Sequence, residues 1–368
     1  MLAFLGGLVP WVLAFIGFAS LVVLHEAGHF AAAKAVGMRV ERFALFFPPL
    51  IFRKQIGETE YAIGAVPLGG YVRISGMSPA EDLPEDVRDR AYHAQPVWKR
   101  IVVIAAGPLV NLVIGVVLLI VFLWLIGPPT AISDRVDEVV PGSPAAGVIE
   151  PGDRLISVDG VRWSPQTLSA VIDGHRCRLA VPVQNCRAAE PAELVIERAD
   201  GSLKEIELTP SYDATTERNR VGFRYGVERE PMALGPAVIR GLDRSVLLAR
   251  LTVELPGRLF DPVQRAQITG VVGSYETTRQ AIIQAPGDVV FILAVISLSL
   301  AIINLFPFLP LDGGHIFWAV VEKVRRKPVP LATMERAGVI GIMLLIPLFM
   351  IGFYNDVGRL MGEGFSLR

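Results

Sequence analysis

Residues 8–33 of this chain form an almost wholly apolar segment that nonetheless contains His25, Glu26 and His29. The segment is long enough to cross a bilayer as one helix. The two histidines are four residues apart, so they lie on one helix face, one turn from each other, as two ligands of one zinc ion require. Glu26, between them, is well placed to take a proton from a metal-bound water. A match this short can arise by chance, but ionisable groups are costly inside a membrane and mark function there.

The composition indicates a membrane protein with several spans. Of the 368 residues 52% are hydrophobic and 19% charged, with a mean hydropathy of +0.48, which is too apolar for a soluble chain of this length. Four stretches reach spanning length, about 8–36, 101–126, 289–311 and 337–353. The net charge of −1 leaves no basic footprint for nucleic acid, and we expect none to bind.

The distribution of Lys and Arg predicts the orientation. Basic residues gather in the loop between the first two stretches and after the third, whereas the first seven residues contain none. The positive-inside rule therefore predicts extracytoplasmic termini, a cytoplasmic first loop and an extracytoplasmic large loop. No cleavable signal peptide is expected, because no basic region precedes the first apolar segment.

A catalytic zinc needs a third protein ligand, and Asp312 is the candidate. The third apolar stretch is interrupted by Pro307 and Pro310, and two glycines follow the aspartate. Non-helical backbone at membrane depth is tolerated only inside protein or beside a water-filled cavity. An aspartate in such a place is expected to bind a cation, which the two histidines would share.

The large loop carries turn and strand signals typical of a small mixed domain. The segments Pro141-Gly142-Ser143-Pro144 and Pro151-Gly152-Asp153 make residues 132–226 resemble a bacterial PDZ domain. Cys177 and Cys186 lie within it. They either form a disulfide, worth roughly 2–3 kcal/mol by the chain-entropy model, or remain free thiols.

Together these motifs make the chain similar to the site-2 protease family of intramembrane zinc metalloproteases, as in the bacterial regulator of sigma-E protease with a single PDZ domain. The resemblance covers nearly the whole chain. It rests on the His-Glu-Ala-Gly-His motif at 25–29, on Asn304 eight residues before Asp312-Gly313, and on two ancillary motifs, Pro-Leu-Gly-Gly-Tyr-Val at 67–72 and Ala-Gly-Pro-Leu-Val-Asn at 106–111. The segment Phe-Phe-Pro-Pro at 46–49 departs from the glycine-rich sequence usual in the family.

The resemblance implies the roles of the candidate residues. Zinc would be held by His25, His29 and Asp312, with Glu26 as the catalytic base. Asn304 would contact substrate backbone or the developing oxyanion, or else form an interhelical hydrogen bond. The β-prone first loop, with Gly69, Gly70 and Tyr71, would pair with an unwound substrate strand. Two further residues are given structural roles, Asn111 in helix packing and His315 at the start of a helix.

The implied protein is a polytopic α-helical membrane protein with four transmembrane helices, a membrane-associated β-hairpin and an inserted extracytoplasmic α+β PDZ domain. The expected parts are residues 1–127, 128–230 (the PDZ domain), 231–287 (a linker with an amphipathic helix over 237–251) and 288–368. It would lie in a bacterial inner membrane, with its active site toward the cytoplasm.

Its substrates would be single-span membrane proteins already trimmed by a site-1 protease, such as anti-sigma factors or signal-peptide remnants. Two alternatives stay open. One is a non-proteolytic scaffold whose PDZ domain recruits partners around a structural zinc, and the other is a protease of external soluble peptides. The retained Glu26 argues against the scaffold, because a structural site does not need a base.

Overall fold

The computed structural model describes residues 2–77, 81–140, 142–164, 167–177, 179, 181–214 and 218–361. Pro141, the first residue of the Pro-Gly-Ser-Pro segment, lies outside them. The chain divides into two compact units, here called the helical unit (Met1–Leu125 with Ala233–Arg368) and the inserted unit (Ile126–Met232).

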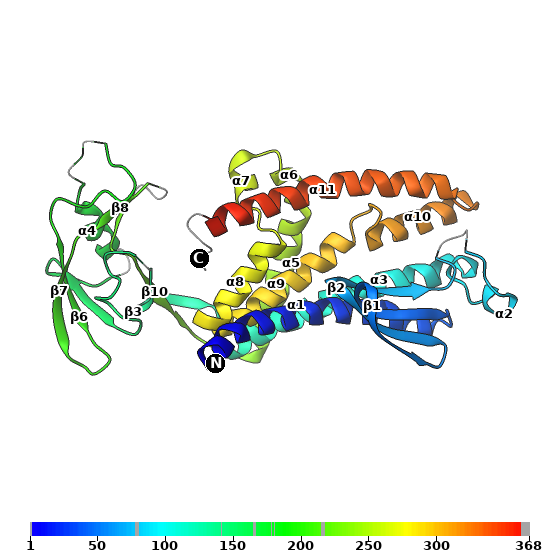
Figure 1. Cartoon of the computed structure of the whole chain (residues 1–368), viewed down its shortest axis with the longest axis horizontal. Helices are drawn as coiled ribbons and strands as arrows, with labels where there is room; N and C mark the ends of the chain where they lie inside the picture. The colour runs from blue at the N-terminus through cyan, green and yellow to red at the C-terminus, as the bar shows by residue number, and fades with distance from the viewer. Residues whose placement is uncertain are drawn as a thin grey trace. The chain divides into compact units, whose positions relative to one another are not determined.

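Among the described residues, four helices are long and apolar enough to cross a membrane. They are α1 (Leu2–Ala35), α3 (Val97–Leu125), α9 (Pro286–Asn304) and α11 (Leu331–Met361) (Figure 1). At most a third of each spanning window is buried, so apolar side chains cover the outer faces of the helices, as contact with lipid requires. The third helix ends at Asn304, before Pro307 and Pro310, which the sequence predicted to break the helix within the apolar stretch 289–311.

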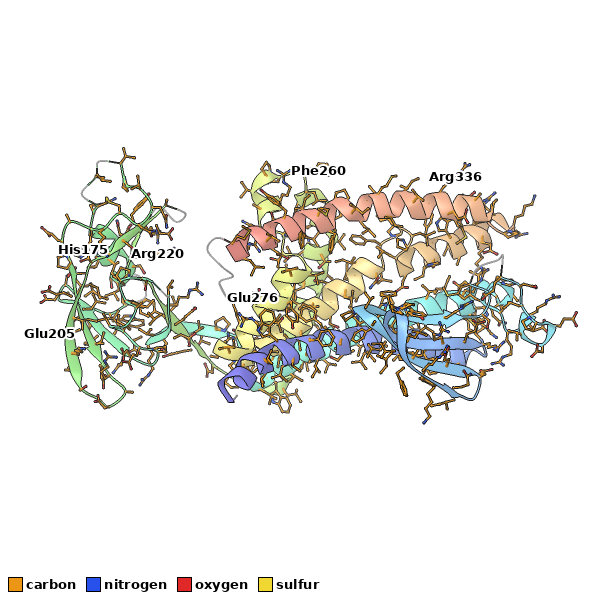
Figure 2. All side chains as sticks on the ribbon, in the orientation of Figure 1. His175, Glu205, Arg220, Phe260, Glu276 and Arg336 are labelled. Carbon is orange, nitrogen blue, oxygen red and sulfur yellow. A yellow bond between two sulfur atoms is a disulfide. The ribbon has the colours of Figure 1, made fainter. Side chains whose placement is uncertain are left out.

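The other α-helices of this unit are α2 (Glu85–Arg88), α5 (Leu234–Val253), α6 (Leu255–Arg258), α7 (Pro262–Ala266), α8 (Val271–Gln284) and α10 (Asp312–Arg325). The helix expected over 237–251 forms as α5. Small buried residues on one face of α5 pack against α3 and α9, and Gly241 meets Ile120 there. Figure 2 shows Phe260 projecting from the segment between α6 and α7, where 89% of the residue is exposed.

The C-terminal part of α11 is tied to the start of α8. Asp356 is fully buried, and its carboxylate accepts hydrogen bonds from the backbone amides of Gly270 (3.1 Å) and Gly273 (2.7 Å). The amides at the beginning of a helix lack partners within the helix, so this carboxylate satisfies two of them.

Two long strands, β1 (Val40–Ile56) and β2 (Thr59–Ile74), form the antiparallel hairpin expected in the first loop, and they lie against α1 (Figure 1). The turn closes at Gly57, whose φ of +62° suits glycine. The next residue, Glu58, accepts hydrogen bonds from Arg90 (2.8 Å) and Lys34 (2.6 Å), so the turn is anchored to the end of α1 and to the segment before α3.

The inserted unit is built around a six-stranded sheet with the order β10-β3-β4-β6-β7, in which β5 also pairs with β4. Its elements are β3 (Pro129–Val139), β4 (Arg154–Val158), β5 (Val161–Arg162), α4 (Thr167–Gly174), β6 (Ala192–Glu197), β7 (Leu203–Leu208), β8 (Ser211–Asp213), β9 (Arg218–Arg220) and β10 (Phe223–Arg229). Alternate residues of β6, Leu194 and Ile196, are fully buried and pack with Leu168 of α4. This period-two burial is the pattern that the sequence predicts for strands.

Candidate metal centre

Three ligand atoms from distant parts of the chain converge in the helical unit. His25 and His29 lie on α1, and Asp312 is the first residue of α10. The Oδ2 atom of Asp312 is 3.1 Å from Nε2 of His25 and 3.3 Å from Nε2 of His29. The two Nε2 atoms are 3.2 Å apart. Both histidines are buried, so the cluster lies inside the protein.

The spacing of these atoms suits a zinc ion. Zinc binds imidazole nitrogen and carboxylate oxygen at about 2.0–2.2 Å, and the ligands of a tetrahedral ion at that distance lie about 3.3 Å from one another. The three observed separations fall within a few tenths of an ångström of this value. Two imidazoles and one carboxylate also leave a fourth position free, as in catalytic zinc sites.

Glu26 lies beside this cluster, next to β2. A Cβ atom on Gly70 would lie 3.0 Å from Cγ of Glu26, so glycine allows the strand to approach the glutamate closely. Glu26 therefore lies between the face of α1 that carries the two histidines and the backbone of β2.

Helix α3 supports both histidines from behind. The Nδ1 atom of His29 lies 2.9 Å from the backbone oxygen of Val103, and Nδ1 of His25 lies 3.3 Å from Nδ2 of Asn111. A Cβ atom on Gly107 would lie 2.5 Å from Cε1 of His29, so only glycine leaves room for that ring. The sequence suggested only helix packing for Asn111. The structure shows that its side chain also contacts His25, a candidate zinc ligand.

Helix α10 is positioned by α3 and by the loop after α9. Arg100 Nη1 of α3 contacts Glu322 Oε2 of α10 at 2.8 Å. A Cβ atom on Gly314 would lie 2.5 Å from the backbone nitrogen of Leu309, so the loop folds back closely onto the start of α10. The ion pair holds the C-terminal part of α10, and the loop holds its start, which carries Asp312.

The other predicted site residues lie outside the three-ligand cluster. Asn304 is the last residue of α9, one loop before Asp312. Gly69, Gly70 and Tyr71 are in β2, where the hydroxyl of Tyr71 accepts a hydrogen bond from Arg42 (3.2 Å). His315 lies in the first turn of α10 and is not a member of the cluster.

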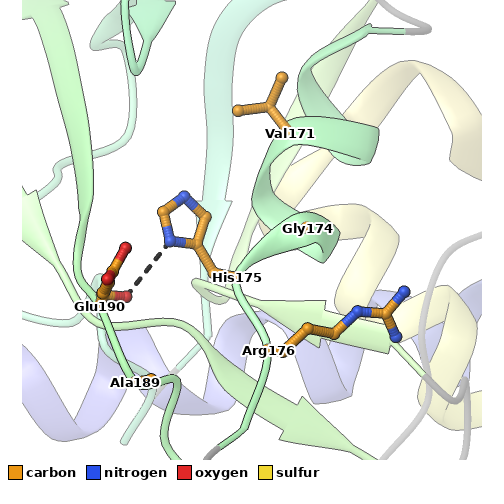
Figure 3. Close-up of a pocket in the computed structure, with 6 residues that line it drawn as sticks. All are labelled: Val171, Gly174, His175, Arg176, Ala189 and Glu190. Atoms are coloured by element: carbon orange, nitrogen blue, oxygen red, sulfur yellow. Dashed lines mark hydrogen bonds between the residues drawn. The ribbon is translucent and has the colours of Figure 1, made fainter.

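The inserted unit contains a pocket of about 320 Å³ at the end of α4, lined by Val171, Gly174, His175, Arg176, Ala189 and Glu190 (Figure 3). His175 is largely buried, with Nε2 at 2.6 Å from Asp159 Oδ2 and Nδ1 at 3.2 Å from the backbone oxygen of Glu190. Close by, Cys177 and Cys186 form a disulfide, with their Cα atoms 5.8 Å apart.

Comparisons with known proteins identify the family. A model of peptidase family M50 matches residues 13–348. The zinc metalloprotease Rip1 of Mycobacterium tuberculosis is 30% identical over 400 aligned positions, which cover 97% of this chain and 96% of Rip1. A candidate zinc metalloprotease of Clostridium perfringens is 30% identical over 349 positions, covering 94% and 98% of the two chains.

One solved structure, the PDZ domain of an SdrC-like protein from Listeria monocytogenes, is 16% identical, covers 27% of this chain and 92% of that one, and gives a TM-score of 0.21. So remote a likeness does not establish a fold, and the PDZ assignment of the inserted unit stays a prediction. The M50 match, by contrast, includes His25, His29 and Asp312, all of α3 and α9 and most of α1 and α11, and the relatives match over nearly their full length. The chain therefore belongs to peptidase family M50, the site-2 protease family, and is a multi-pass membrane zinc metalloprotease.

Proposed function

We propose that this protease hydrolyses peptide bonds in or near the transmembrane segments of single-span membrane proteins. One observation carries the proposal: the three ligand atoms meet between a helix long enough to span the membrane, α1, and the broken end of another apolar segment, between α9 and α10. A site in that place reaches peptide bonds within the bilayer more readily than those of soluble peptides.

In this mechanism His25, His29 and Asp312 would hold the zinc, which would supply Lewis-acid activation of a water and of the scissile carbonyl. Glu26 takes the proton from the attacking water and returns it to the leaving amine. Gly70 of β2 lets that strand lie against the side chain of Glu26.

Strand β2 supplies a surface for the substrate in this proposal. A transmembrane helix must unwind locally before it is cleaved, and its freed backbone groups then need new partners. The segment Gly69-Gly70-Tyr71 lies next to Glu26, where an extended substrate could add as a strand. Asn304, at the end of α9, would contact the substrate backbone or the oxyanion.

The proposed substrates are single-span proteins already trimmed by a site-1 protease, including anti-sigma factors and signal-peptide remnants. The inserted unit, as an extracytoplasmic PDZ domain, would exclude untrimmed ectodomains or bind a new C-terminus. In this arrangement both termini are extracytoplasmic, the β1–β2 hairpin is cytoplasmic, and the membrane is the bacterial inner membrane.

Substituting Glu26→Gln tests the chemistry. In proteoliposomes containing a single-span substrate, we expect the variant to lose cleavage while retaining zinc. Glu335→Gln, at an exposed position of α11, is the matched control and should cleave like the wild type. Cleavage by Glu26→Gln at the wild-type rate would contradict the role of Glu26 as the base. Cleavage of soluble peptides but not of the embedded substrate would favour the alternative protease.

Cysteine labelling in intact cells tests the orientation. His93→Cys lies before α3 and Glu205→Cys lies on β7 of the inserted unit, each at an exposed position. A membrane-impermeant maleimide should label Glu205→Cys in intact cells, and should label His93→Cys only after the inner membrane is permeabilised. The reverse pattern would invert the proposed topology.

A further inference from the structure

Each metal-ligating histidine has a polar partner on α3 at the ring nitrogen that faces away from Asp312. His29 has the backbone oxygen of Val103 at 2.9 Å from Nδ1. His25 has the side-chain amide of Asn111 at 3.3 Å from Nδ1. In both rings Nε2 is the atom directed at Asp312. The two histidines are therefore supported in parallel, one by backbone and one by a side chain.

Metal binding decides which end of the Asn111 amide must face the ring. A neutral imidazole that ligates through Nε2 carries its proton on Nδ1, so its partner there must be an acceptor. The oxygen of Val103 meets this requirement for His29. For His25 the amide must present Oδ1. As placed, Oδ1 of Asn111 is buried without a partner among the described residues, so a half-turn of the amide breaks no hydrogen bond of the oxygen.

The surroundings of Asn111 show why its side chain contacts His25 rather than solvent. The residue has no exposed surface. Its backbone oxygen accepts a hydrogen bond from Ser297 Oγ of α9 at 2.8 Å, which holds this turn of α3 against α9. The side chain then extends toward α1, where the His25 ring is its hydrogen-bond partner. A buried amide without a partner is costly, so the contact is strongly favoured.

We propose that Asn111 is a positioning residue for the zinc site: its Oδ1 accepts the Nδ1 proton of His25 and thereby keeps Nε2 unprotonated and directed at the metal. This inference rests on the proposed function, in which His25 is a zinc ligand. It also gives a role to the Ala-Gly-Pro-Leu-Val-Asn motif. Gly107 makes room for His29 and Asn111 orients His25, four residues apart on one face of α3.

Zinc affinity of the purified full-length chain in detergent, measured by competition with a chelator, tests the proposal. Asn111→Leu keeps the approximate volume and removes the acceptor, whereas Asn111→Asp keeps an acceptor. We expect Asn111→Leu to weaken zinc binding 10–100-fold, and Asn111→Asp to stay within about threefold of the wild type. The visible spectrum of the cobalt-substituted protein should change in the leucine variant and keep its tetrahedral form in the aspartate variant.

Two controls separate positioning from stability and from the ligand assignment. Leu119→Ala removes a buried side chain from the same helix, two turns further along, and should lower Tm without changing zinc affinity. His25→Ala should abolish tight binding. If it does not, the proposed ligand set fails, whatever the behaviour of Asn111.

The inference on Asn111 is overturned if His25→Ala loses zinc while Asn111→Leu binds it as tightly as the wild type. It is also overturned if the leucine and aspartate variants weaken binding equally, because that would be a packing effect. If Asn111→Leu does not fold, Asn111→Ala is measured in its place, with the same two outcomes.

Discussion

Replacing Gly107 by alanine would test how closely α3 must pack against the zinc site. The added Cβ atom would lie 2.5 Å from Cε1 of His29 and closer still to Nε2. Carbon atoms in contact are about 3.5–4.0 Å apart, so the ring or the helix must move by about 1 Å. The ring cannot turn freely, because its Nδ1 is held at 2.9 Å from the Val103 oxygen.

A movement of that size exceeds what a metal site tolerates. Ligand distances in working sites stay within about 0.2 Å of their standard values. We therefore expect Gly107→Ala to lose at least about 10-fold in zinc affinity, the lower end of the loss seen when outer-shell support is removed. The loss in the free energy of unfolding should be smaller than overpacking alone would give. Overpacking costs about 1–3 kcal/mol, and improved helix propensity offsets about 1 kcal/mol of it.

The measurement is chelator competition on the purified chain, with Tm recorded in parallel. Gly115→Ala is the matched control, because it makes the same substitution two turns along α3. Its Cβ would meet Cγ of Leu298 at 2.5 Å, a side chain that packs with Leu119 and Ala294. Gly115→Ala should change Tm and leave zinc affinity within about threefold of the wild type. Equal zinc affinity in the two variants would refute the idea that the glycine makes room for His29.

Three further predictions concern other parts of the chain. Hydrogen bonds from Arg90 and Lys34 lower the pKa of Glu58 to about 2, from 4.5. Because the pKa is lower in the folded protein, this stabilisation is complete above about pH 4.5 and is lost as the pH falls toward 2. Hydrogen exchange at the hairpin turn should therefore rise over that range in the wild type but not in Glu58→Gln. Removing the carboxylate with Asp356→Ala should destabilise the helical unit by about 1–3 kcal/mol and raise exchange at the start of α8, and unchanged exchange there would contradict its capping role. The double substitution Cys177→Ser and Cys186→Ser should lower the free energy of unfolding of the inserted unit by roughly 2–3 kcal/mol, which faster hydrogen exchange in residues 126–232 would report. Exchange equal to that of the wild type would show that the disulfide does not stabilise the unit.

The sequence was most informative where a residue was out of place chemically. His25 and His29 in an apolar span require a reason to be buried, and so does Asp312 beside two prolines. Each of them could therefore be proposed as a ligand from the sequence, and the structure brings the three side chains together. The same reasoning predicted that Pro307 and Pro310 break the helix within the apolar stretch 289–311, and the helix ends at Asn304 although hydropathy continues to Leu311.

The support from α3 was harder to predict. A backbone oxygen such as that of Val103 has no signature in a sequence, and a single asparagine in a span is more often helix packing than a second-layer contact. One signal was available. Gly107 and Asn111 have the same four-residue spacing as His25 and His29, as two facing helix surfaces would require. Recognising that match needs the knowledge that α1 and α3 are neighbours, which only the fold provides.

The division of the proposed ligands between α1 and α10 sets the time at which the enzyme can first become active. His25 and Asp312 are 287 residues apart, so at 5–20 residues per second a ribosome takes about 15–60 s to travel from one to the other. Throughout that interval the growing chain holds two histidines and Glu26, one ligand fewer than a catalytic zinc requires. Proteolysis thus waits until α10, which carries Asp312, has been made. Under the proposed function, the protease is therefore unable to attack its neighbours at the insertion site, or itself, before that helix is in place.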